Sequence, residues 1–184
     1  GSCIFYHNGV ALPHCADGGI KMDIRGKKVL VFGSGISGEG SCRLLLEKGA
    51  DVVLYDGNEK LCADEIEAKI LETKKENGQF SIVLGTFPEE IIEELSFVVM
   101  SPGVPTDLPI VEKMREKSIP IWGEIELAYV FGKGDVLAIT GTNGKTTVCT
   151  LLQQILSKAF SKSVPLVGNV GIPASTLCGR GKDG

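Results

Sequence analysis

The sequence predicts an α/β fold: a Rossmann-like, doubly wound parallel sheet, followed by the start of a second α/β domain built on a phosphate-binding loop. Short apolar segments alternate with amphipathic ones between Lys28 and Phe131, which favours parallel strands joined by right-handed helical crossovers. The strand segments are apolar throughout, as expected for strands that are covered on both faces. A Gly-Lys-Thr-Thr loop at Gly144 then restarts the pattern.

The expected elements of the first domain are separated by Gly, Pro and Asn, which break helices and form turns. Strands are expected at Lys28–Phe32, Asp51–Tyr55, Phe80–Leu84, Phe97–Met100 and Ile119–Trp122. Helices are expected at Glu39–Lys48, Leu61–Glu76, Pro88–Glu94, Leu108–Lys117 and Glu124–Phe131. Gly49 suits a helix C-terminus and Pro88 a first helical turn.

The second domain is expected after a hinge at Gly132-Lys133-Gly134. A strand should begin at Asp135, and a helix should run from Gly144 to about Lys158. We expect the apolar face of this helix to pack on a sheet, because its members recur at helical spacing: Val148, Leu151, Leu152, Ile155 and Ala159.

These features divide the chain into three expected parts. Residues 1–21 begin with Gly-Ser, show no clear period and precede Met22, so we interpret them as an extension or tag-like segment. Residues 22–132 form the Rossmann-like domain, and residues 133–184 form a nucleotide-binding domain that is cut off partway.

Composition narrows the possible partners. The net charge is −4 and no basic block is present, which argues against nucleic acid as a partner. No apolar run approaches the roughly 20 residues that a bilayer requires, which argues against a membrane partner. The cysteines lack Cys-x-x-Cys spacing, so we expect reduced thiols and a cytoplasmic protein. They are Cys3, Cys15, Cys42, Cys62, Cys149 and Cys178.

The first candidate site is the motif Gly33-x-Gly35-x-x-Gly38, which lies between a strand and a helix. Such glycines let the backbone turn tightly and approach a phosphate-bearing ligand. Asp56 ends the next strand, where a carboxylate can accept hydrogen bonds from a nucleoside. Neither feature selects NAD over another nucleotide, and a tight turn without a ligand would also fit.

The second candidate site is the loop Thr140-Gly141-Thr142-Asn143-Gly144-Lys145-Thr146-Thr147. The common phosphate-loop pattern needs a glycine where Ile139 stands, so this loop is a shortened variant. Its N–H groups would face a phosphate, Lys145 would add positive charge, and the Thr146 hydroxyl could reach Mg²⁺. A phosphate-loop enzyme also needs a carboxylate for Mg²⁺, yet the only acid after Lys145 is Asp183.

Several stretches within about residues 22–177 form one combination. They are Val29–Gly38, Val99–Val104 with its Ser-Pro-Gly turn, Gly123–Ala128, Ala138–Thr147, and Gly168-Asn169-Val170-Gly171. Together they resemble the Mur ligase family, and within it the branch that adds D-glutamate. The resemblance implies a Mur ligase central domain after the Rossmann-like one.

The resemblance implies a bacterial, ATP-dependent ligase of peptidoglycan synthesis. The enzyme would join D-glutamate to UDP-N-acetylmuramoyl-L-alanine through an acyl phosphate. ATP and Mg²⁺ would be required, with Lys145 catalytic and Thr146 a Mg²⁺ ligand. By the same resemblance, ATP would be bound by Gly141, Thr142, Asn143, Gly144, Lys145, Thr146 and Thr147. The UDP-sugar would be bound by Gly35, Ile36, Ser37, Asp56, Gly57, Ser101, Gly103 and Asn169.

Other readings stay open from the sequence alone. Many relatives have Thr or Lys where Gly57 and Asn58 stand, so the uracil contacts at these positions are open. An NAD(P)-binding oxidoreductase would suit Gly33 to Gly38 with Asp56, although it leaves the Gly-Lys-Thr-Thr loop unexplained. A non-catalytic UDP-sugar-binding module is the second alternative. The oligomeric state is undetermined, with a monomer as the expectation, and we expect no ligase activity from this chain alone.

Overall fold

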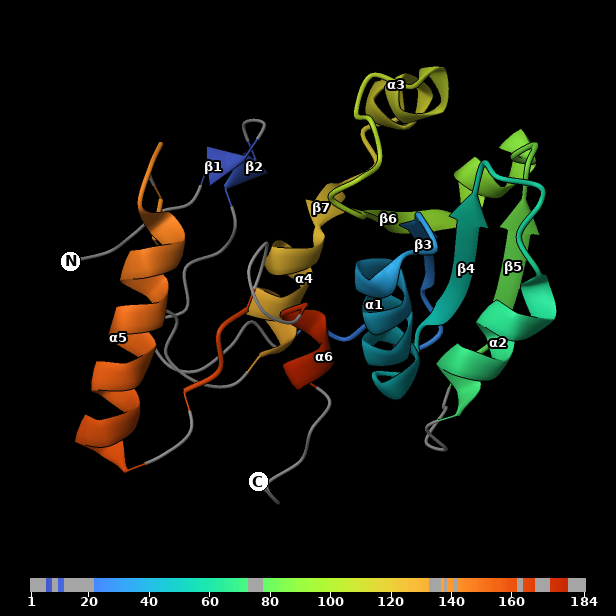
Figure 1. The fold of residues 1–184 in the computed structure, drawn as a ribbon. Helices are drawn as coiled ribbons and strands as arrows, with labels where there is room; N and C mark the ends of the chain where they lie inside the picture. Colours follow the sequence, from blue (N-terminus) through green and yellow to red (C-terminus); the bar gives the residue numbers. More distant parts are fainter. Residues whose placement is uncertain are drawn as a thin grey trace.

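The computed structural model describes residues 6–7, 10–11, 22–72, 78–132, 137, 139–140, 142–161, 164–167 and 173–178. Its main sheet has five parallel strands in the order β5-β4-β3-β6-β7 (Figure 1). The strands are β3 (Lys28–Phe32), β4 (Asp51–Asp56), β5 (Phe80–Leu84), β6 (Leu95–Met100) and β7 (Ile121–Gly123). The helices are α1 (Ile36–Glu47), α2 (Ala63–Leu71), η1 (Glu89–Glu94, a 3-10 helix), α3 (Pro109–Glu116), α4 (Glu124–Phe131), α5 (Lys145–Phe160) and α6 (Ser175–Cys178).

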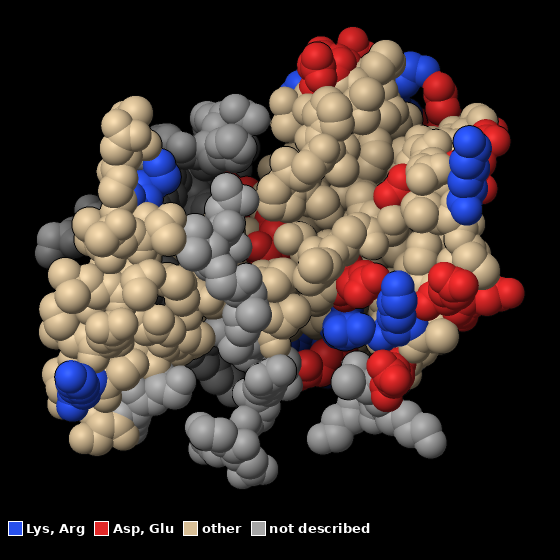
Figure 2. All heavy atoms as spheres, viewed as in Figure 1, with Lys and Arg blue, Asp and Glu red and all other residues tan. Residues whose placement is uncertain are grey.

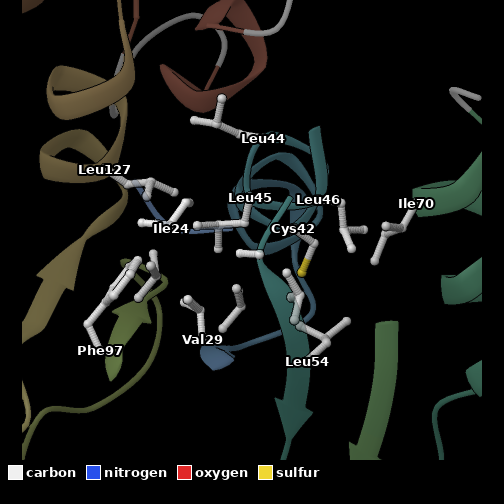
Figure 3. Packing of buried hydrophobic residues seen from close by; sticks show 14 of the residues in the cluster. Ile24, Val29, Cys42, Leu44, Leu45, Leu46, Leu54, Ile70, Phe97 and Leu127 are labelled. Atoms are coloured by element: carbon white, nitrogen blue, oxygen red, sulfur yellow. The ribbon is translucent and has the colours of Figure 1, made fainter. Parts of the chain in front are cut away.

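Both faces of the sheet are covered, so the predicted doubly wound α/β fold is confirmed. Alternate residues of β3 point to opposite faces, as the pleat of a strand requires. Val29 and Val31 pack with Cys42, Leu45 and neighbouring residues of α1, α2 and α4 (Figure 3). Leu30 and Phe32 pack on the other face, where η1 and α3 contribute Ile92, Val111 and Met114. These two apolar layers fix the sheet between its helices.

The strand order reverses at β3. β4 and β5 continue to one side of it, whereas β6 and β7 lie on the other side. In open parallel sheets the connections diverge at such a point and leave a crevice beyond the carboxyl ends of the strands. The loops after β3, β4 and β6 therefore meet at one edge of the sheet.

The predicted elements of the first domain are all present, with corrected ends. The helix expected from Glu39 begins at Ile36, inside the glycine motif, because Gly35 already supplies its extended N-cap. The helix expected from Leu61 begins at Ala63 and ends at Leu71, and residues 73–76 of that expectation lie outside the described residues. The remaining ends differ by a residue or two, where fraying and capping decide the boundary.

Residues 1–21, which the sequence analysis leaves outside the fold, contain one small pairing. β1 (Tyr6–His7) and β2 (Val10–Ala11) form a two-stranded antiparallel sheet. Neither strand joins the main sheet.

The cysteines whose side chains the structure describes are free thiols. Cys42 is fully buried in the core, and this burial raises the pKa of its thiol well above the usual range. It therefore remains protonated and packs as a small apolar side chain. Cys62 is exposed and Cys149 is half-buried.

The helix α5 forms as predicted, but the expectation that its apolar face packs on a sheet is wrong for the described part of the chain. Val148, Leu151 and Ile155 are 51%, 56% and 53% exposed, and no residue of α5 is buried. The strand expected from Asp135 falls mostly outside the described residues, and no described sheet covers the helix. In Figure 2 the visible surface over α5 is mostly uncharged, with basic side chains only near its two ends. The apolar pattern of α5 is therefore present, but no layer of described residues covers it.

We expect Gly38→Ala to destabilise the first domain by at least about 3 kcal/mol, the upper end of overpacking costs. A Cβ on Gly38 would lie 1.8 Å from the carbonyl oxygen of Gly33, which is backbone that cannot rotate away. Gly35→Ala is the matched control, because a Cβ there meets nothing within 4 Å. Its effect should stay within about 1 kcal/mol.

Denaturant unfolding followed by Trp122 fluorescence measures both variants. Trp122 is the single tryptophan of the chain and its ring lies 4.5 Å from that of Phe97, so it reports on the sheet. Equal losses of stability in the two variants would contradict the steric explanation.

Candidate functional site

The turn after β3 is held by the ends of both neighbouring strands. The N–H of Gly33 donates to the carbonyl of Tyr55 at 2.8 Å, and the N–H of Ser101 donates to the carbonyl of Phe32 at 3.0 Å. The Ser101 hydroxyl also donates to the Gly33 carbonyl at 3.3 Å. Gly33 has φ +99°, and a Cβ there would lie 2.8 Å from Val104. Only glycine fits, so the turn approaches the loop after β6 closely.

A cleft of about 500 Å³ opens at this edge of the sheet. Three predicted substrate-binding residues, Asp56, Gly57 and Gly103, line it. A Cβ on Gly103 would meet nothing within 4 Å, and one on Gly57 only the Tyr55 hydroxyl at 3.8 Å. These glycines are therefore not required by packing within the protein, and they leave backbone accessible to a ligand. The other lining residues are Phe32, Gly33, Tyr55, Asn58, Val104, Pro105 and Leu108.

The start of α1 faces the same turn. The first N–H groups of an α-helix have no partner within the helix, so they can bind an anion. Here they follow Gly35, which is exposed and has no side chain in the way. Ile36 is 73% exposed although it is a large apolar residue, and Ser37 is half-buried. The three predicted residues 35–37 thus lie together at a helix N-terminus.

Asp56 is fixed by hydrogen bonds from its own surroundings. Its Oδ2 accepts from the N–H of Ser34 at 2.9 Å and from the Ser34 hydroxyl at 2.6 Å. Its Oδ1 accepts from the N–H of Asn58 at 3.0 Å. Partial burial would raise the pKa of Asp56, but these hydrogen bonds outweigh it and lower the pKa below the usual carboxyl range. Asp56 therefore ties the glycine turn to β4, while its oxygens keep lone pairs for a ligand.

A second, smaller hollow of about 330 Å³ adjoins the cleft and shares Phe32, Tyr55 and Leu108 with it. The Tyr55 ring lies 4.7 Å from that of Phe32 and 4.9 Å from that of Phe87. These aromatic residues could not be recognised from the sequence as lining a hollow, since each resembles an ordinary core residue in an apolar segment. Tyr55 precedes Asp56 directly, and that position is the only signal that could have pointed to it.

The phosphate loop leads directly into α5. Gly144 has φ +78°, a left-handed conformation suited to glycine, and α5 begins at Lys145. The Lys145 ammonium donates to the carbonyl of Thr142 at 3.1 Å. Residues 142–147 are all exposed, and no acid lies in the first turn of α5. Gly141 lies outside the described residues.

These residues fit a nucleotide phosphate group better than they fit a complete magnesium site. Exposed N–H groups at the start of a 16-residue helix, a lysine and a glycine turn suit phosphate oxygens. Mg²⁺ needs near-octahedral oxygen ligands, and residues 142–147 offer threonine hydroxyls, among them that of Thr146, and one side-chain amide oxygen, but no carboxylate. After Lys145 the sequence has no acid before Asp183. Within the described residues, no group of three or more His, Cys, Asp or Glu side chains could hold a metal ion.

The structure thus brings most predicted UDP-sugar residues to one edge of the sheet, whereas the predicted ATP residues gather at the start of α5. Ser101 joins the first group through its bond to Gly33. Asn169, the remaining member of that group, lies outside the described residues. None of the described helices is long and apolar enough to cross a bilayer.

We expect Asp56 to make stability depend on pH in the acid range. Because its pKa is lowered in the folded chain, the unfolded chain binds the proton first as the pH falls. The contribution of Asp56 is therefore complete above the ordinary carboxyl pKa of about 4 and is lost as the pH falls through the lower folded value.

The measurement is the difference in unfolding free energy between wild type and Asp56→Asn, from about pH 7 down to about pH 2.5. The difference should shrink toward acid. Asp107→Asn removes the same charge at an exposed position and serves as the control. A difference for Asp56 that is constant over this range would contradict the prediction.

Two family models match the chain. The model described as Mur ligase MurD-like, N-terminal domain, matches residues 27–123, and the Mur ligase middle domain matches residues 139–177. Among solved structures, a pseudomurein peptide ligase type C from Methanothermus fervidus is 25% identical, with a TM-score of 0.44, over 72% of this chain and 26% of that chain.

Two curated relatives are named UDP-N-acetylmuramoylalanine--D-glutamate ligase. The protein from Lachnospira eligens is 47% identical over 150 residues, which are 82% of this chain and 32% of the relative. The protein from Lachnoclostridium phytofermentans is 49% identical over 156 residues, which are 85% of this chain and 33% of the relative. The chain therefore spans about a third of the length of these relatives. Because the N-terminal model alone matches residues 27–123 of the 184, the chain belongs to the Mur ligase family.

Proposed function

We propose that this chain carries the UDP-sugar-binding domain and the ATP phosphate loop of a ligase that joins D-glutamate to UDP-N-acetylmuramoyl-L-alanine. One observation carries the proposal: a crevice at the point where strand order reverses and a separate phosphate loop occur in one chain of this family. A dehydrogenase would use the crevice but would leave Lys145 and its loop without a role. The two relatives that bear the ligase name support the same choice. We place the enzyme in the bacterial cytoplasm.

In this proposal the cleft beside β3 binds the UDP end of the substrate. The start of α1 and the open backbone at Gly35 and Gly103 offer N–H groups to the diphosphate. Asp56, held by Ser34, and Gly57 lie where the uracil would bind. Ser101 acts on the ligand indirectly, because it braces the Gly33 turn.

Lys145 and the start of α5 would bind the ATP phosphates. Charge spreads over the transferring phosphoryl group, so a positioned ammonium and helix N–H groups stabilise the transition state. Binding ATP would require the Lys145 ammonium to exchange the Thr142 carbonyl for phosphate oxygens. Thr146 would contribute its hydroxyl to Mg²⁺, and further magnesium ligands would come from ATP and from the rest of the enzyme.

Calorimetric titration of UDP-N-acetylmuramoyl-L-alanine into this chain tests the first half of the proposal, with NADH as the control ligand. We expect binding of the UDP-sugar and none of NADH. Gly35→Val adds a branched side chain where we propose that the protein backbone contacts the ligand. It should therefore weaken the binding at least about tenfold. Binding of NADH alone would replace the proposal by a dinucleotide-binding function.

We expect Lys145→Ala to lower turnover by about two to three orders of magnitude, because a charge that stabilises the transferring phosphoryl group is lost. The assay needs the rest of the enzyme. It therefore uses a chimera in which this chain replaces the aligned 156 residues of the Lachnoclostridium phytofermentans relative. Lys158→Ala removes a lysine from the other end of α5 and is the matched control. Normal phosphate release by the Lys145 variant would contradict the assignment of the ATP loop.

A further inference from the structure

The short helix α6 packs against the first domain although it follows the phosphate-loop helix in sequence. It contacts α1 and α4 (Figure 1). α6 lies within residues 139–177, the range of the middle-domain match, whereas α1 lies within the N-terminal match. The chain thus leaves the first domain after α4 and returns to it at α6.

Gly40 permits this close return. Glycine in the middle of a helix costs about 1 kcal/mol relative to alanine, so its presence in α1 needs a reason. A Cβ on Gly40 would lie 2.7 Å from the Ser175 hydroxyl oxygen and 2.9 Å from the Thr176 methyl group. One helical turn later, Leu44 is buried and lies between α1 and α6 in Figure 3. The glycine thus provides the space that α6 occupies.

Glu124 binds α6 from the other side. It is 3% exposed and lies in the first turn of α4, where the positive end of the helix favours its charge. Its Oε1 accepts a hydrogen bond from the N–H of Ser175 at 2.6 Å. A buried carboxylate is costly unless it is hydrogen-bonded, so this bond matters to both elements. Leu127 and Ala128 continue the same buried face of α4.

We propose that Glu124 and Gly40 form a clasp that fixes α6 to the first domain, and that Glu124 thereby acts as a positioning residue for the phosphate loop. The phosphate loop and α5 lie between two attachments, the covalent one at the end of α4 and the clasp at α6. A segment held at both ends samples fewer positions than one held at a single end. The clasp therefore limits where the phosphate loop can lie relative to the cleft beside β3.

Amide hydrogen exchange of residues 174–178 in this chain tests the clasp without any ligand. Glu124→Ala leaves the Ser175 N–H unpaired, so exchange should accelerate roughly 10- to 100-fold, as expected when a hydrogen bond to a charged group is lost. Glu124→Gln keeps an acceptor oxygen and should restore exchange to within about threefold of wild type. Glu126→Ala is the matched control, because Glu126 caps α4 at Gly123 rather than binding α6.

Gly40→Ala gives an independent test, because its expected effects on α1 and on the clasp have opposite signs. Alanine strengthens the helix α1 but pushes α6 away, so exchange at residues 174–178 should accelerate while the unfolding midpoint does not fall. Trp122 fluorescence shows whether each variant is folded. Unchanged exchange at residues 174–178 in both Glu124→Ala and Gly40→Ala would overturn the clasp.

The positioning role, which rests on the proposed function, is tested in the ligase chimera. Glu124→Ala should lower kcat at least about tenfold and leave the KM for ATP within about twofold, because it touches neither binding site. Glu124→Gln should recover most of the turnover. Equal kcat for Glu124→Ala and wild type would overturn the positioning role. A wild-type chimera without ligase activity would instead count against the proposed function, and the exchange experiment would still decide on the clasp.

Discussion

The close approach of the turn after β3 to the end of β6 is the constraint on which the rest of the first domain depends. Gly33 must be glycine because Val104 and Ser101 occupy the place of a Cβ, and Gly38 must be glycine because the Gly33 carbonyl lies against it. These contacts start α1 immediately after the turn. They place its N-terminus at the carboxyl edge of the sheet, where strand order reverses, so the packing of the turn also sets the position of the proposed anion site.

Asp56 adds a second link between the turn and β4. Its carboxylate accepts hydrogen bonds from the backbone and the hydroxyl of Ser34, in addition to the bond from the Gly33 N–H to the Tyr55 carbonyl. The same carboxylate lies in the wall of the cleft. A side chain that is already fixed by the protein loses little freedom when a ligand binds, which favours affinity. In the proposed function, the cleft would therefore be organised before the substrate binds.

Much of the first domain could be predicted, because strands and glycine turns leave local signals in the sequence. The apolar segments gave every strand of the main sheet, and the motif from Gly33 to Gly38 located the turn. Contacts between distant residues left no such signal. From the sequence, Ser34 is one of the variable positions of the glycine motif, Glu124 is an acid at the start of a helix, and Gly40 is a glycine that weakens α1. In the structure each of them contacts a residue far along the chain. The helix α5 shows a related limit of the sequence. Its periodic apolar pattern predicts the helix correctly but does not predict which layer covers the apolar face.

The two candidate phosphate sites differ in how firmly the described residues around each one fix its geometry. The cleft beside β3 lies on a sheet buried on both faces, and its turns are fixed by hydrogen bonds and close packing. The phosphate loop has exposed residues 142–147, and the helix behind it has no buried residue. The position of an exposed loop depends on what holds its ends. In the proposed reaction, the contact of α6 with Glu124 therefore matters more to phosphoryl transfer than to the binding of either substrate alone.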